Sequence, residues 1–291
     1  MNALFDSQLI VPGTLAGAFL LLLCLEAVRP LRRRSRPLTH RLLVNFCMTG
    51  LVFVVGTFVV KPVGGGLSVW TSYHLFGLLH LFEVPSEVQF ILGFLLMDLT
   101  FYYWHRANHL IPILWRFHNV HHVDPDLDVS TAFRFHVVEI LYSTAFRFLQ
   151  VGLIGISPIT YAVYEITFAC ATMFHHCNFH IPIRYERLLN KVIVTPRMHG
   201  IHHSNVKNET NSNYSVVFRW WDALHKSLRL NIPQSQIKTG IAAYQKPEDN
   251  TLLNLLRMPF GRQREYWRLA DGKQPLREVV VTEDPVGYMK D

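Results

Sequence analysis

Long apolar stretches separated by short polar segments dominate the first 176 residues of the chain. The longest holds about 20 residues, which is enough to cross the hydrocarbon core of a bilayer as a helix. We therefore expect an all-α integral membrane protein, with about four transmembrane helices or hairpin arms and a cytosolic, histidine-rich catalytic cap. The apolar stretches are residues 9–28, 42–60, 88–104, 137–156 and 159–174.

The segments between these stretches predict how the helices connect. No basic segment precedes the first stretch and no small-residue cleavage site follows it, so we interpret it as a retained anchor. The glycine-rich segment 61–66 predicts a loop, and residues 67–84 are too broken for a clear crossing, which favours a re-entrant or interfacial segment. Ser157-Pro158 separates the last two stretches and predicts a hairpin whose two ends lie on the same side of the membrane.

Charge gives the expected orientation and domain plan. Five arginines lie within residues 29–36, directly after the first stretch, and such a cluster marks the cytoplasmic side. Counting crossings from that cluster places the histidine-rich segments at the cytoplasmic face. We expect a transmembrane anchor region over residues 1–87, a catalytic domain over 88–230 and a polar, weakly ordered tail over 231–291.

Composition agrees with a membrane protein. Half of the residues are hydrophobic and only 17% are charged, below the quarter that is usual in soluble domains. The net charge of +7 is dispersed, so we interpret it as attraction to a membrane surface and not as nucleic-acid binding. The four cysteines form no CxxC pair, which favours buried free thiols over disulfides or a zinc knuckle.

Three histidine motifs stand near the ends of the apolar stretches. Residues three and four apart share one face of a helix, so each motif can direct two or three imidazoles at one point. Neutral imidazole binds iron, zinc and copper well. Eight imidazoles exceed what one zinc ion uses, and therefore imply two metal ions. The motifs are HxxxH at His105 and His109, HxxHH at His118, His121 and His122, and HxxHH at His199, His202 and His203.

Several other polar residues lie near these motifs. His136, His175 and His176 are further candidate metal ligands at the expected membrane exit, and His180 is a weaker one. Asp98 precedes His105 by two helical turns and could orient a ligand from a second shell. The remaining expectations concern residues without a metal role. They are structural or interfacial histidines at His40, His74, His80 and His225, solvated loop acids at Asp126 and Asp128, and pairing of Glu139 and Glu165 with Arg134 or Arg147.

At these motifs the chain resembles the fatty acid hydroxylase and sterol desaturase superfamily. The resemblance extends over about residues 88–230 and includes all eight motif histidines. It implies an integral membrane enzyme with two iron ions, which can be purified with zinc in their place, that uses dioxygen to hydroxylate or desaturate a lipid. The segments that carry it are Asp98 to His109 (DLTFYYWHRANH), Leu114 to Asp124 (LWRFHNVHHVD), Thr131 to Glu139 (TAFRFHVVE) and Thr195 to Ser204 (TPRMHGIHHS).

The resemblance also sets the expected partners. No cytochrome b5 signature and no glycine-rich dinucleotide fingerprint is present in the sequence, so we expect a separate electron donor of the cytochrome b5, ferredoxin or reductase type. The expected location is a bacterial inner membrane or the endoplasmic reticulum. Two alternatives remain open at this point, a membrane zinc hydrolase and a metal transporter or store. The first lacks an HExxH motif, and the second would place its ligands along the spans.

Overall fold

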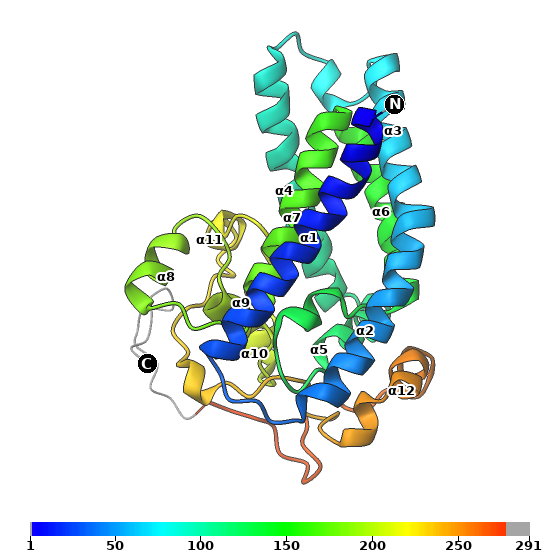
Figure 1. The fold of residues 1–291 in the computed structure, drawn as a ribbon. Coiled ribbons are helices and arrows are strands. Elements are labelled where there is room, and N and C mark those ends of the chain that lie inside the picture. Colours follow the sequence, from blue (N-terminus) through cyan, green and yellow to red (C-terminus); the bar gives the residue numbers. More distant parts are fainter. Residues whose placement is uncertain (1, 278–291) are drawn as a thin grey trace.

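The computed structural model describes the backbone of residues 2–277 and the side chains from residue 11 onward. Long helices form a bundle, and shorter helices and loops form a cap at one end of it (Figure 1). Residues 2–277 contain no strand beyond isolated bridge pairs, so the prediction of an all-α protein is confirmed. The long helices are α1 (Asn2–Val28), α2 (Leu38–Val55), α3 (Lys61–His74), α4 (Ser86–Leu110), α6 (Val137–Ile154) and α7 (Pro158–His176).

The cap consists of residues 112–136 and 177–277. Its helices are short, and each lies beside a loop that carries buried polar residues. They are α5 (Pro112–His122), η3 (Val129–Phe133), α8 (Ile183–Leu189), α9 (Pro196–His202), α10 (Lys207–Thr210), α11 (Trp220–Leu224), η4 (Gln234–Gln236), η5 (Pro247–Asn250), α12 (Leu252–Arg257) and η6 (Met258–Phe260).

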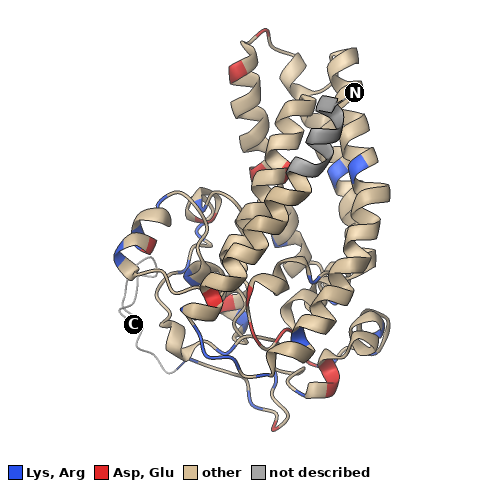
Figure 2. Cartoon of the chain, viewed as in Figure 1, with Lys and Arg blue, Asp and Glu red and all other residues tan. Residues whose placement is uncertain are grey.

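Three helical segments of the described chain are long and apolar enough to cross a membrane. They are Val11–Val28, Leu38–His80 and Val137–Ile154. Charged residues are sparse along the bundle and gather in the cap (Figure 2). Helices α4 and α7 are not among these segments, although α4 packs against both α6 and α7 in the bundle. The crossing predicted over residues 88–104 lies within helix α4, and this helix carries a buried acid, Asp98.

The predicted loop at residues 61–66 is wrong. A five-residue π-helix, η1 (Gly56–Val60), follows α2 and runs directly into α3, so the helical path continues to His74. Pro62 lies in the first turn of α3, directly after the π-helix, and its missing N–H interrupts the helical hydrogen bonding there. Gly64 packs on Tyr161, whose hydroxyl would lie 2.1 Å from an added Cβ, so this glycine serves close helix packing and not a turn.

The predicted hairpin between residues 137 and 174 is confirmed. Helix α6 ends at Gly155, whose φ of 74° lies in the left-handed region that favours glycine. Ser157 then caps α7 and Pro158 occupies its first turn. The two arms bring the start of α6 and the end of α7 to the cap (Figure 1). Inside the hairpin Arg147 pairs with Glu165 at 3.2 Å, one of the predicted pairings.

The expectation of a weakly ordered tail is wrong for much of residues 231–277. Ile241, Tyr244 and Leu255 are buried in one apolar cluster with Val44 of α2 and Trp115 of α5. A polar average composition hides these apolar residues because they are spaced singly between polar ones. The rest of the predicted tail, residues 278–291, lies outside the described residues.

Buried ion pairs join the bundle to the cap. Arg41 of α2 donates to Asp124 at 2.8 Å and pairs with Asp128 at 2.5 Å, and all three side chains are buried. Asp126 is also buried and accepts hydrogen bonds from the backbone N–H groups of Ser35 and Arg36. Asp126 and Asp128 were expected to be solvated, and this was wrong, because α2 and the arginine segment pack over their loop. All four cysteines are free thiols, as predicted, although Cys24 and Cys47 are exposed.

Candidate metal centre

Four helices deliver nine histidines to the junction between bundle and cap. Helix α4 ends at this junction and packs against α5, and helix α7 ends there and packs against α9. All nine side chains are buried. The spacing of three and four residues predicted that each motif directs its imidazoles at one point, and the structure brings all three motifs together. The prediction of one point for each motif is wrong for the two HxxHH motifs, because the first and last histidines of each converge at one point and the middle histidine at another.

The nine side chains form two adjoining groups. The ligand nitrogens within each group lie within 4.8 Å of one another. The two groups touch, because the rings of His122 and His203 stack with centroids 4.3 Å apart. The five-histidine group is His105, His109, His118, His122 and His202, and the four-histidine group is His121, His176, His199 and His203.

The four-histidine group has a geometry that fits a metal ion. Its Nε2 atoms are 3.1 Å apart between His121 and His176, 3.0 Å between His176 and His199, and 3.1 Å between His199 and His203. One Nε2 atom has either one hydrogen or one lone pair in the ring plane, so hydrogen bonds cannot satisfy all three contacts. Metal–nitrogen bonds of about 2.1 Å at right angles would place neighbouring ligand atoms about 3.0 Å apart.

Hydrogen bonds on the outer side of several rings leave the inner nitrogen free. Nδ1 of His105 donates to Tyr214 O at 2.7 Å, and Nδ1 of His202 donates to Ser212 O at 2.6 Å. Nδ1 of His176 donates likewise to Thr172 O at 2.7 Å. A carbonyl acceptor fixes the tautomer and leaves Nε2 with its lone pair, the usual arrangement of a metal-bound histidine.

His118 has a carboxylate partner instead of a carbonyl. Its Nδ1 donates to Oε1 of Glu139 at 2.7 Å, and both side chains are buried. Its Nε2 lies in the five-histidine group and has no hydrogen-bond partner among the described residues. This histidine–carboxylate pair was not predicted, because Glu139 was expected to pair with an arginine. The sequence indicated this role of Glu139 only by its position, one turn after His136 at the start of a helix near the motifs.

The electrostatics of both groups favour neutral imidazoles. Burial lowers the pKa of His121, His122, His199 and His203 well below the ordinary histidine value, and the neighbouring imidazoles lower it further. Neutral imidazole is the form that binds metal. A donor set made only of imidazole nitrogens suits iron, zinc or copper, and not magnesium or calcium.

Two predicted ligands and the predicted second-shell acid lie outside the two groups. His136 caps α6, where its Nδ1 accepts from Val138 N–H at 3.1 Å and its Nε2 donates to Leu256 O at 3.2 Å. His175 stacks on His199 with ring centroids 4.1 Å apart, but its nitrogens are not among the converging ones. Asp98 accepts from Trp221 Nε1 at 2.7 Å, so it holds the cap segment that follows Tyr214.

The other histidines also lie outside the two groups. His225 bonds the Tyr103 hydroxyl at 2.6 Å, and His74 bonds the backbone of its own helix at Trp70 O. His180 belongs to neither group. His40 and His80 belong to neither group as well.

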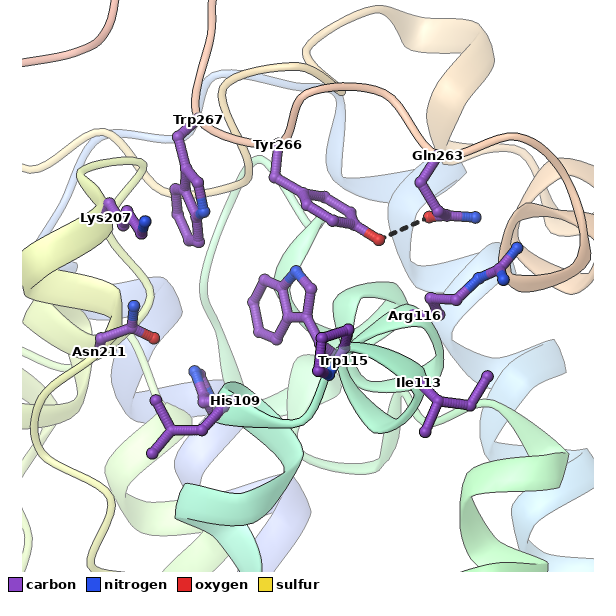
Figure 3. A pocket seen from close by; sticks show the side chains of 11 residues that line it. His109, Ile113, Trp115, Arg116, Lys207, Asn211, Gln263, Tyr266 and Trp267 are labelled. Carbon is purple, nitrogen blue, oxygen red and sulfur yellow. Dashed lines mark hydrogen bonds between the residues drawn. The ribbon is translucent and has the colours of Figure 1, made fainter.

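A pocket of about 670 Å³ opens beside the five-histidine group (Figure 3). His109 is the member of that group that lines it. Trp115 and Trp267 stack across it with ring centroids 5.8 Å apart. The remaining lining residues are Leu110, Pro112, Ile113, Arg116, Lys207, Asn211, Gln263 and Tyr266.

Comparison with known proteins assigns this constellation to a family. Residues 90–227 match the family model described as fatty acid hydroxylase, and all nine converging histidines lie within that match. The segment of residues 90–227 belongs to the fatty acid hydroxylase family. The sequence resemblance is thereby confirmed. No solved structure matches the chain.

Three relatives of this superfamily illustrate its range. The chain is 30% identical to the ornithine lipid hydroxylase OlsE of Rhizobium tropici over 201 residues. This aligned stretch covers 69% of this chain and 58% of that protein. It is 29% identical over 156 residues to the alkylglycerol monooxygenase of Homo sapiens, 54% of this chain and 33% of that protein. It is 28% identical over 141 residues to the cholesterol 25-hydroxylase of Homo sapiens, 46% and 49% respectively. The chain thus spans less than two thirds of each relative.

Proposed function

We propose that this protein is a membrane-embedded oxygenase that holds two iron ions and hydroxylates or desaturates a lipid C–H bond. The observation that carries the proposal is the pair of adjoining histidine groups at the end of an apolar helical bundle. One imidazole group of four and one of five match two metal ions better than a single zinc ion with three ligands. The family match and the relatives named as lipid hydroxylases and monooxygenases support it.

The ligands of the proposed centre are divided between the two groups. His105, His109, His118, His122 and His202 would hold one ion, and His121, His176, His199 and His203 the other. When bound, iron would supply the activation of dioxygen and the removal of hydrogen from an unactivated carbon, with electrons from a separate donor.

The protein's own residues position and protect this centre. Glu139 fixes the His118 ring and raises its basicity as a ligand. Arg41, Asp124 and Asp128 tie α2 to the loop that follows His121 and His122, so these ligands cannot move independently of the bundle. Burial of all nine imidazoles excludes water from the reacting region, and the pocket at His109 provides the route for a substrate.

The proposed setting is a multi-pass membrane protein with its centre at the cytoplasmic face. Support comes from the arginine segment 29–36, which lies at the cap end of α1 (Figure 1). A lipid could then leave its tail in the bilayer while its reacting carbon reaches His109.

Lipid mass spectrometry under ¹⁸O-labelled dioxygen tests the proposal. Cells that express the protein should accumulate a lipid heavier by one labelled oxygen, or lighter by two hydrogens, and cells without it should not. His199→Ala should abolish the product while the protein stays in the membrane, because His199 contacts two neighbours in the four-histidine group. An unlabelled hydrolysis product, or full turnover by His199→Ala, would contradict the oxygenase.

A further inference from the structure

The pocket beside His109 combines an apolar wall with uncompensated positive charge. Trp115, Tyr266 and Trp267 supply broad aromatic surfaces, whereas Arg116 and Lys207 supply two cations. None of the eleven lining residues is acidic. Arg116 and Lys207 are therefore the only lysine, arginine, aspartate or glutamate side chains in the lining.

The acids that lie within two residues of a pocket-lining residue along the chain are already paired. Glu209, on the same short helix as Lys207, is buried and pairs with Arg277 at 2.8 Å. Glu265, next to Tyr266, pairs with Arg268 at 2.6 Å. Arg116 donates one hydrogen bond to Gly261 O at 2.8 Å, while its buried Nε has no partner among the described residues. The pocket therefore offers positive charge that the described chain does not neutralise.

Aliphatic side chains lie close to the cations in this pocket. Leu110 and Ile113 lie at the junction of α4 and α5, with 55% and 57% of their surfaces exposed. Arg116 lies beside Ile113, and Lys207 lies on the other side of Trp115 (Figure 3). Exposed aliphatic residues at the end of a bundle helix suit contact with lipid chains. An occupant with an apolar chain and an acidic end would match this mixture of aliphatic, aromatic and cationic side chains.

We infer that this pocket is the head-group site of the substrate, and that it selects a lipid with an acidic head group, a phosphate or a carboxylate. Arg116 and Lys207 are then specificity-determining residues. Arginine can form two parallel hydrogen bonds to either acidic group, and lysine adds a point charge. The inference rests on the proposed function only in treating His109 as part of the reacting centre. A neutral sterol would leave both cations without a partner.

Binding measurements on metal-free protein in nanodiscs of zwitterionic lipid test this without turnover. The probes are dodecyl phosphate, dodecanoate and the neutral dodecylglycerol, and quenching of tryptophan fluorescence by brominated forms of each reports occupancy near Trp115 and Trp267. We expect one or both acidic probes to bind about tenfold more tightly than dodecylglycerol, and the two acidic arms separate phosphate from carboxylate selection.

Charge variants decide whether the cations cause that preference. Arg116→Ala and Lys207→Ala should each weaken binding of the acidic probe by about threefold to fivefold and leave dodecylglycerol binding unchanged. Lys207→Arg should retain the preference. Lys273→Ala removes one exposed charge outside the pocket and should change nothing. Equal affinity for acidic and neutral probes, or acidic binding that survives both alanine substitutions, would overturn the inference.

The two proposals fail separately. A protein that prefers acidic amphiphiles through Arg116 and Lys207 but never consumes oxygen would retain the head-group site and refute the oxygenase. A protein that oxidises lipids but binds neutral and acidic probes alike would retain the oxygenase and refute the head-group site.

Discussion

At the scale of single residues, the bond from His118 to Glu139 is the clearest link between a candidate ligand and its support. Its 2.7 Å length and full burial predict that Glu139→Gln lowers metal affinity by about 10- to 100-fold, because the amide cannot supply the negative charge that polarises the imidazole. Competition titration of the purified protein with a chelator measures this. Glu265→Gln, an exposed control, should bind metal as the parent does. Unchanged affinity in Glu139→Gln would remove Glu139 from the centre.

His136 allows the ligand set itself to be tested. Because its Nδ1 caps α6, His136→Asn should keep that cap and retain both metal ions. His176→Ala removes a nitrogen from the centre of the four-histidine group, so it should lose about one metal ion per chain. Elemental analysis of the two variants, purified identically, gives the stoichiometry. If His136→Asn lost metal as His176→Ala does, the division into five and four histidines would need revision.

The sequence predicts the position of some of these residues correctly and not that of others, and the difference has a physical reason. The eight motif histidines and His176 follow from helical spacing and from their place at the end of apolar stretches. Glu139 and His136 do not, because local spacing cannot tell whether a side chain at a helix start faces the centre or caps its own helix.

At the scale of elements, the turn between α6 and α7 controls how the bundle presents the site. Gly155 has a positive φ, and an added Cβ there would lie 2.3 Å from the backbone oxygen of Phe76. We expect Gly155→Ala to lower the free energy of unfolding by about 1–3 kcal/mol, since neither backbone can move away cheaply. Gly50→Ala, within α2 and with open space around its Cβ position, is the matched control and should be neutral or stabilising.

Thermal unfolding in detergent measures both glycine variants. An unfolding temperature for Gly155→Ala equal to that of the parent would mean that the contact between the two turns is not tight. The hairpin between α6 and α7 could be predicted from the sequence, but the continuation of α2 into α3 could not. A Ser-Pro pair between two apolar stretches breaks a helix locally, whereas Gly64 is understood only through its contact with Tyr161, nearly 100 residues away.

At the scale of the whole molecule, the cap is held by contacts that join distant parts of the chain. Arg32 is half-buried and donates to Gln234 Oε1 at 2.6 Å, and its partial burial lowers its pKa to about 10. Arg36 donates to Gln245 O at 2.7 Å. The segment expected to mark only a membrane side therefore also anchors residues 231–245. Sequence patterns report hydropathy along the chain, so they predicted the bundle but missed this closure of the cap by its C-terminal part.

The position of the cap relative to the membrane leads to a labelling prediction. The turn before α4 and the cap lie at opposite ends of the bundle (Figure 1). On a background with Cys24, Cys47, Cys170 and Cys177 replaced by alanine, we expect Glu83→Cys to react with a membrane-impermeant maleimide in intact cells, because Glu83 is exposed at that turn. Lys238→Cys, exposed in the cap, should react only after permeabilisation. The reverse pattern would place the histidine centre on the outer face. Reaction of both in intact cells would argue against a spanning bundle, because the three apolar segments would then not separate the two ends.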